Sequence, residues 1–142
     1  MNKKAFRVPD YLGHILSAIE RIERYTENMD KAGFLANDLV QDAAIRNIEI
    51  VGEASNNVQR VFPEFADLHS EIPWRVMYTM RNRVSHGYED VDLEIIWGTI
   101  RSDLPELYQQ VRKVVQSLPR DDNDPPDSES KSEPSSDDGF KM

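Results

Sequence analysis

The sequence predicts an all-α protein, an up-and-down bundle of four main helices. Apolar residues recur at three- and four-residue spacing through four long segments, and no segment alternates apolar and polar residues as a strand would. Proline, glycine, asparagine and aspartate lie where these segments are expected to begin and end. The chain of 142 residues contains no internal repeat, so its length suits one domain with a single core.

The first predicted helix starts near Pro9 and Asp10 and runs to about Asn28. Its apolar stripe consists of Tyr11, Ile15, Ala18, Ile19, Ile22 and Tyr25. His14 lies beside this stripe, and we interpret it as a packed or surface histidine rather than a catalytic one. Residues 29–37 then form a connection to the next helix.

The second helix is predicted over residues 38–60, with Asn37 or Asp38 as its N-cap. Its stripe includes Leu39, Ala43, Ile50, Ala54 and Val58. Gly52 within this helix costs about 1 kcal/mol relative to alanine, which is tolerable if a neighbouring helix approaches closely there. Pro63 ends the helix, and residues 61–72 are predicted to be a turn-rich connector.

The third helix is predicted over residues 73–86, with Val76, Met77, Met80 and Val84 as its stripe. Asp90 or Asp92 caps the last helix, in which Pro105 predicts a kink or a restart near residues 102–103. The stripe of this last helix consists of Leu93, Ile96, Trp97, Ile100, Leu104, Leu107, Val111, Val114 and Val115. Trp74 and Trp97 are predicted to be core residues.

The net charge of −9 is unevenly distributed along the chain. Residues 119–142 contain three basic residues against eight acidic ones, which gives −5 and leaves −4 for residues 1–118. This tail has too little apolar surface to offset the entropy of ordering. The sequence therefore predicts a helical domain over residues 1–118 and a disordered acidic tail over residues 119–142.

Composition argues against several classes of function. The chain has no cysteine, and its three histidines lie far apart in no ligand spacing, so we expect neither a metal site nor a cofactor. No apolar run approaches the length of a membrane span, and the basic first residues are not followed by the apolar stretch of a signal peptide. These features predict a cytoplasmic protein without a membrane partner.

The segment Met80-Arg81-Asn82-Arg83-Val84-Ser85-His86-Gly87-Tyr88 concentrates polar chemistry at the end of the third helix. No acidic residue lies between Glu71 and Glu89, whereas Arg75, Arg81 and Arg83 make the segment locally cationic. A cationic helix end within an acidic protein indicates a site for an anion such as a phosphate chain. Alternatively, the arginines only complement the helix dipole, and His86 is a capping residue.

Helical geometry relates the polar side chains of this segment to one another. Asn82 and His86 are four residues apart and share a face, whereas Arg81 lies about 140° from His86 around the axis. Arg81 must therefore reach round the helix or work with a residue of another helix or subunit. Glu53 is either part of a surface pattern of charge pairs or an inward-facing carboxylate that orients Arg81 or His86.

The spacing Arg81-Asn82-x3-His86 resembles the Arg-x4-6-His motif of the HEPN (higher eukaryotes and prokaryotes nucleotide-binding) superfamily. Tyr88 extends the match to Arg-x4-His-x-Tyr, which is similar to the HepT toxin branch. The segments Ile72-Pro73-Trp74, Asp92-Leu93-Glu94-Ile95-Ile96-Trp97 and Gly52-Glu53-Ala54 are similar to that branch as well. The resemblance covers roughly residues 10–118 and does not extend to the acidic tail.

The resemblance implies a homodimeric toxin of a type VII-like toxin–antitoxin system that cleaves RNA without a metal ion. It places Arg81, Asn82 and His86 in catalysis and suggests supporting roles for Glu53 and Arg83. The implied partner is a minimal nucleotidyltransferase that adenylylates the motif tyrosine, here Tyr88, and no DNA partner is expected. A noncatalytic HEPN dimer that binds nucleotides or its nucleotidyltransferase would carry the same helices, so this alternative stays open.

Overall fold

The computed structural model describes residues 6–86 and 91–119, apart from the side chains of Arg83, Ser85 and His86. Every regular element within these ranges is helical, which confirms the predicted all-α class for this part of the chain. The elements are α1 (Val8–Tyr25), α2 (Lys31–Leu35), α3 (Asp38–Val61), α4 (Pro63–Leu68), α5 (Trp74–His86), α6 (Leu93–Gly98), the π-helical η2 (Thr99–Asp103) and α7 (Leu104–Ser117).

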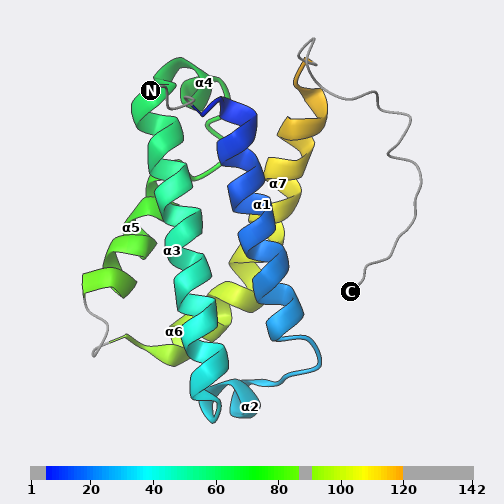
Figure 1. Cartoon of the computed structure of the whole chain (residues 1–142), viewed down its shortest axis with the longest axis vertical. Helices are drawn as coiled ribbons and strands as arrows, with labels where there is room; N and C mark the ends of the chain where they lie inside the picture. The colour runs from blue at the N-terminus through cyan, green and yellow to red at the C-terminus, as the bar shows by residue number, and fades with distance from the viewer. Residues whose placement is uncertain (1–5, 87–90, 120–142) are drawn as a thin grey trace, which may run out of the picture.

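Helix α3 occupies the centre of the arrangement. Its most extensive contacts are with α5 on one side and α1 on the other, and α7 packs against α1. Figure 1 shows α1, α3 and α7 running side by side along the long axis, with α5 crossing the flank of α3 that faces away from α1. The short helices α2 and α4 lie at opposite ends of α3 (Figure 1). The segment that carries the Arg81 motif is thus held mainly by α3.

Side-chain caps explain where α3 and α6 begin. Asn37 accepts a hydrogen bond from the backbone N–H of Val40 at 3.0 Å, and Asp92 accepts one from the N–H of Glu94 at 3.0 Å. Both residues were among the predicted caps, whereas Asp90 lies outside the described residues. Helix α1 ends at Tyr25, before the predicted end at Asn28, because Asn28 has a left-handed backbone with φ of 64°.

Two predicted connections contain short helices, which corrects the sequence interpretation. Pro63 does end α3, but it then occupies the first turn of α4, where the missing N–H of proline costs no hydrogen bond. The first connection contains α2, whose N-cap Asp30 accepts from the N–H of Gly33 at 2.8 Å. The irregularity predicted from Pro105 is confirmed, because η2 directly precedes α7 and Pro105 lies in the first turn of α7.

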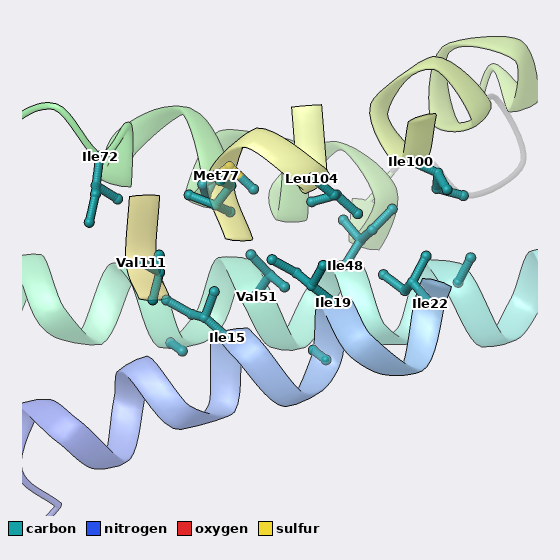
Figure 2. Packing of buried hydrophobic residues seen from close by; sticks show 14 of the residues in the cluster. Ile15, Ile19, Ile22, Ile48, Val51, Ile72, Met77, Ile100, Leu104 and Val111 are labelled. Atoms are coloured by element: carbon teal, nitrogen blue, oxygen red, sulfur yellow. The ribbon is translucent and has the colours of Figure 1, made fainter. Parts of the chain in front are cut away.

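The core lies between α1, α3, α5 and α7, as Figure 2 shows for Ile15, Ile48, Met77 and Leu104. Trp74 and Trp97 are only 5% and 9% exposed, which confirms their predicted place in the core. The predicted stripes were wrong at two positions, since Leu39 is 78% exposed and Val76 is 62% exposed. Leu12, which the predicted stripe of the first helix omitted, is fully buried.

None of the helices in residues 6–86 and 91–119 combines the length and the apolar character needed to cross a membrane.

Candidate functional site

The site begins with the close approach of α5 to α3 at Gly52. A Cβ atom at this position would overlap Cβ of Arg81 and would lie 2.8 Å from the carbonyl oxygen of Met77. Any larger residue would therefore push α5 away from α3. The glycine predicted to permit a close helix contact does so beneath Arg81, and it brings the next residue of α3, Glu53, within reach of the guanidinium.

Three neighbours fix the guanidinium of Arg81. Its Nη2 lies 3.2 Å from Oε1 of Glu53, and its Nη1 donates a hydrogen bond to Oδ1 of Asn82 at 3.1 Å. The ring of Tyr78 lies 6.0 Å from Cζ of Arg81, a cation–π distance. These two polar contacts use only part of the five N–H donors of a guanidinium, and the side chain keeps 28% of its surface exposed. Arg81 is thus oriented and still accessible to an anion.

Glu53 contacts Arg81, as the interpretation of Glu53 as an orienting carboxylate predicted. It does not face inward, however, although that interpretation also predicted an inward orientation. Its side chain is 56% exposed, so the ion pair lies at the surface of the α3–α5 crossing. An exposed pair of this kind stabilises the fold by at most about 1 kcal/mol. Its effect is to hold one edge of the guanidinium toward α3.

Asn82 presents its amide nitrogen for other contacts, because its Oδ1 is occupied by Arg81. His86 is the last residue of α5, five residues after Arg81, which corresponds to a rise of about 7.5 Å along the helix axis. The side chains of His86 and Arg83, and all of Tyr88, lie outside the described residues. The structure therefore brings Arg81, Asn82 and Glu53 together and leaves the placement of the other three predicted site residues as a prediction.

A pocket of about 350 Å³ opens beside Arg81, between the start of α1 and the middle of α3. The rings of Phe6, Tyr11 and His14 form one side of it. The other side carries Arg46, Glu49, Glu53, Asn57 and Arg81. Of these residues, only Glu53 and Arg81 were predicted to have a functional role. Their meeting with residues of α1 was not predicted, because residues from α1, α3 and α5 meet only once the helices pack.

A second, larger hollow of about 530 Å³ lies between α5 and the α6–η2 segment. Its lining is mainly apolar and includes Val76, Met80 and Ile95. Val76 and Ile95 are 62% and 53% exposed, so an apolar surface lies beside the motif helix, away from its contact with Gly52 of α3.

No group of three or more His, Cys, Asp or Glu side chains is placed to hold a metal ion among the described residues.

Comparison with known families finds a match to the "Ribonuclease HepT-like" family over residues 15–114, which is more than half of the chain. This region contains all of α3 and α5 and most of α1 and α7, together with Arg81 and His86. No solved structure matches the chain significantly.

Several curated proteins are similar in sequence. "Probable ribonuclease HepT" of Thermococcus cleftensis is 42% identical over 74% of this chain and 93% of its own length. A protein of Caldanaerobacter subterraneus subsp. tengcongensis, provisionally named as an RNase, is 35% identical over 75% of this chain and 92% of its own length. A Methanocaldococcus jannaschii protein, whose name combines gamma-glutamylcyclotransferase with a provisional RNase assignment, is 37% identical over 80% of this chain. This chain matches half of the length of that last protein.

Proposed function

Because this chain belongs to the HepT-like ribonuclease family, we propose that it is a metal-independent endoribonuclease and the toxin of a type VII-like toxin–antitoxin system. The proposal places Arg81, Asn82 and His86 in catalysis, with Glu53 and Arg83 in support, and takes RNA as the substrate. We expect the protein to act in the cytoplasm without a cofactor.

The contacts and the partial exposure of Arg81 give this proposal its main support. A guanidinium held by a carboxylate, an amide and a ring, and still 28% exposed, is prepared to bind an anion without reorganising. Its planar fork matches the two non-bridging oxygens of a phosphodiester, which become more negative in the transition state. The three similar proteins described above all carry ribonuclease or RNase in their names, and the phosphodiester of RNA fits this chemistry.

The proposed reaction needs a base, an acid and a cation. Its bonds and protons are all accounted for without a metal ion. The ribose 2′-oxygen bonds to phosphorus, and its proton passes to the imidazole of His86. The bond from phosphorus to the 5′-oxygen breaks, and that oxygen takes a proton from an imidazolium. The products are a 2′,3′-cyclic phosphate and a 5′-hydroxyl. Arg81 stabilises the charge on the phosphorane-like transition state, and the amide nitrogen of Asn82 donates to phosphate or orients the imidazole.

A homodimer would supply the second histidine, since one imidazole does not comfortably serve as base and acid in the same step. In this proposal the motif helices of two subunits face each other, and the partner subunit's His86 protonates the leaving oxygen. The exposed apolar side chains of Val76 and Ile95, which flank the motif helix, support an association through this surface.

Regulation is assigned to Tyr88, two residues beyond His86. Transfer of AMP from ATP to the Tyr88 hydroxyl by a partner nucleotidyltransferase releases pyrophosphate and adds an anionic, bulky group beside the phosphate site. Co-expression with the partner should raise the intact mass by one or more AMP units and silence cleavage. Tyr88→Phe should stay active and escape silencing; neutralisation equal to that of wild type would mean that the partner inhibits by complex formation alone.

The catalytic assignment is tested with Arg81→Ala and His86→Ala. We expect each to abolish RNA cleavage while circular dichroism shows unchanged helix content, because neither residue belongs to the predicted apolar stripe of this helix. Arg24→Ala is the matched control, since Arg24 is an exposed arginine in the last turn of α1, where it stacks on Tyr25. Cleavage retained in both Arg81→Ala and His86→Ala would contradict the catalytic assignment of these two residues. No cleavage by the wild-type chain would favour the noncatalytic binding module over the enzyme.

A further inference from the structure

The pocket between α1 and α3, lined by Phe6, Tyr11, His14, Glu49, Asn57 and Arg81 among others, has an aromatic side. The ring centroids of Phe6 lie 5.5 Å from Tyr11 and 5.3 Å from His14, and those of Tyr11 and His14 lie 6.1 Å apart. All three pairs meet edge to face, which is a favourable arrangement that fixes the rings relative to one another. Phe6 is nevertheless 52% exposed, and His14 is exposed as well.

Aromatic rings that are ordered and accessible are the usual platform for an unpaired nucleobase, because every base offers a flat face to stack. The three rings have no role in the catalytic scheme above. They do lie in the same pocket as Arg81, the proposed phosphate ligand.

The opposite side of the pocket is polar and carries two carboxylates. Glu49 lies 3.7 Å from Arg46, and Glu53 lies 3.2 Å from Arg81. A carboxylate repels a phosphate group but accepts hydrogen bonds from the N–H groups of a base. Asn57 accepts from Arg60 through Oδ1 at 2.8 Å, so its amide nitrogen remains the atom with which it can donate.

This combination of acceptors and donor selects among the four RNA bases. Guanine presents two adjacent donors, N1–H and N2–H, that match the two oxygens of one carboxylate, and its O6 beside them is an acceptor. Adenine, cytosine and uracil each present a single donor nitrogen on that edge. A pocket of about 350 Å³ is at the small end of ligand sites and suits one nucleoside rather than a duplex.

We propose that this pocket binds an unpaired guanine of the RNA, with its ring stacked on the Phe6, Tyr11 and His14 side and its N–H edge toward Glu49. The adjoining phosphate then reaches Arg81. The pocket thus determines where the RNA is cut. This inference rests on the proposed function, because it takes Arg81 as the ligand of the RNA phosphate.

Binding is measured first, independently of cleavage. The four ribonucleoside monophosphates are titrated into the full chain while proton NMR follows the ring protons of His14, assigned with His14→Gln. We expect GMP to bind with the highest affinity and to shift these protons upfield, as a stacked base does. The absence of a shift with GMP, or equal affinities for GMP and AMP, would overturn the proposal.

Variants then test the two sides of the pocket on a single-stranded RNA with one guanosine. Phe6→Ala should raise KM by about fivefold to a hundredfold, the effect of losing one stacking ring. Glu49→Gln should lower the preference for guanosine over adenosine by about tenfold, because glutamine has a single acceptor oxygen. The matched controls Leu39→Ala and Glu27→Gln, at exposed positions near the other end of the bundle, should leave both values unchanged.

The ribonuclease proposal and the guanine-subsite proposal can be disproved separately. If GMP shifts the His14 protons but the wild-type chain cleaves no RNA, the subsite stands and the ribonuclease assignment is wrong. If RNA is cleaved at Arg81 and His86 but Phe6→Ala and Glu49→Gln behave like their controls, the ribonuclease stands and the guanine subsite is wrong.

Discussion

At the scale of single residues, the account depends on the contact between Gly52 and Arg81. The absence of a side chain at Gly52 lets α5 lie against α3, and this approach brings the guanidinium of Arg81 within 3.2 Å of Glu53. A residue without a side chain thereby positions the guanidinium that is proposed to bind the RNA phosphate. Its position in the middle of α3 costs helix stability, so the close approach is the physical reason to have glycine there.

Gly52→Ala should lower the free energy of unfolding by about 1–3 kcal/mol and should impair cleavage, because the new Cβ displaces Arg81 and α5. Gly13→Ala is the matched control: Gly13 lies inside α1, and a Cβ there would have no atom within 4 Å. This control should raise the free energy of unfolding by up to about 1 kcal/mol. Urea denaturation measures both changes, and equal responses of the two variants would show that α5 does not depend on the glycine.

At the scale of helices, the neighbouring carboxylates Glu20 and Glu23 on α1 lower the stability of the fold to a degree that depends on pH. Partial burial of its carboxyl group, and next the neighbouring charge of Glu20, raise the pKa of Glu23 above its ordinary value, although the residue as a whole is exposed. Glu20 itself accepts a hydrogen bond of 2.7 Å from the hydroxyl of Tyr108 on α7, so it cannot simply move away. The folded state therefore holds a proton on Glu23 more tightly than the unfolded state does.

A raised pKa means that Glu23 supports the fold below its unfolded pKa and that this support is lost as pH rises through the folded pKa. Glu23→Gln should therefore be more stable than wild type at pH 7, by less than about 1 kcal/mol since the group is exposed. The difference should vanish below about pH 4. Thermal melts between pH 3 and pH 8 measure it, and a difference that does not change with pH would contradict this origin.

Sequence alone predicted the helical elements to different degrees. The caps Asn37 and Asp92 were found because capping is local, and the restart before α7 followed from Pro105. Helix α4 was missed because a proline that ends one helix equally well begins another. Leu39 was misplaced because helical periodicity does not say which apolar residues a neighbour covers.

The candidate site was predictable only in part for the same reason. Arg81 and Asn82 are adjacent, so their contact follows from the chain itself. The pairing of Arg81 with Glu53 depends on how closely α5 approaches α3, and the meeting of Phe6, His14 and Arg81 depends on three separate segments. Such contacts are properties of the packed molecule and leave no spacing pattern in the sequence.

At the scale of the whole molecule, the apolar surface beside the motif helix should be the dimer interface. Wild-type protein at micromolar concentration should sediment at twice the 16.4 kDa chain mass. Ile95→Glu introduces a charge on this surface and should give a monomer that no longer cleaves RNA, because the second histidine is lost. Leu68→Glu changes an exposed leucine on α4 and should stay dimeric and active. A fully active Ile95→Glu monomer would contradict the two-histidine mechanism.

The central claim, metal-independent RNA cleavage by the Arg81–His86 motif, is tested most directly by incubating the purified chain with single-stranded RNA in excess EDTA and identifying the product ends. We predict cleavage by wild type, products with 2′,3′-cyclic phosphate and 5′-hydroxyl ends, and no products with His86→Ala. Cleavage that disappears with EDTA and returns with a divalent cation, or that persists in His86→Ala, would contradict the account.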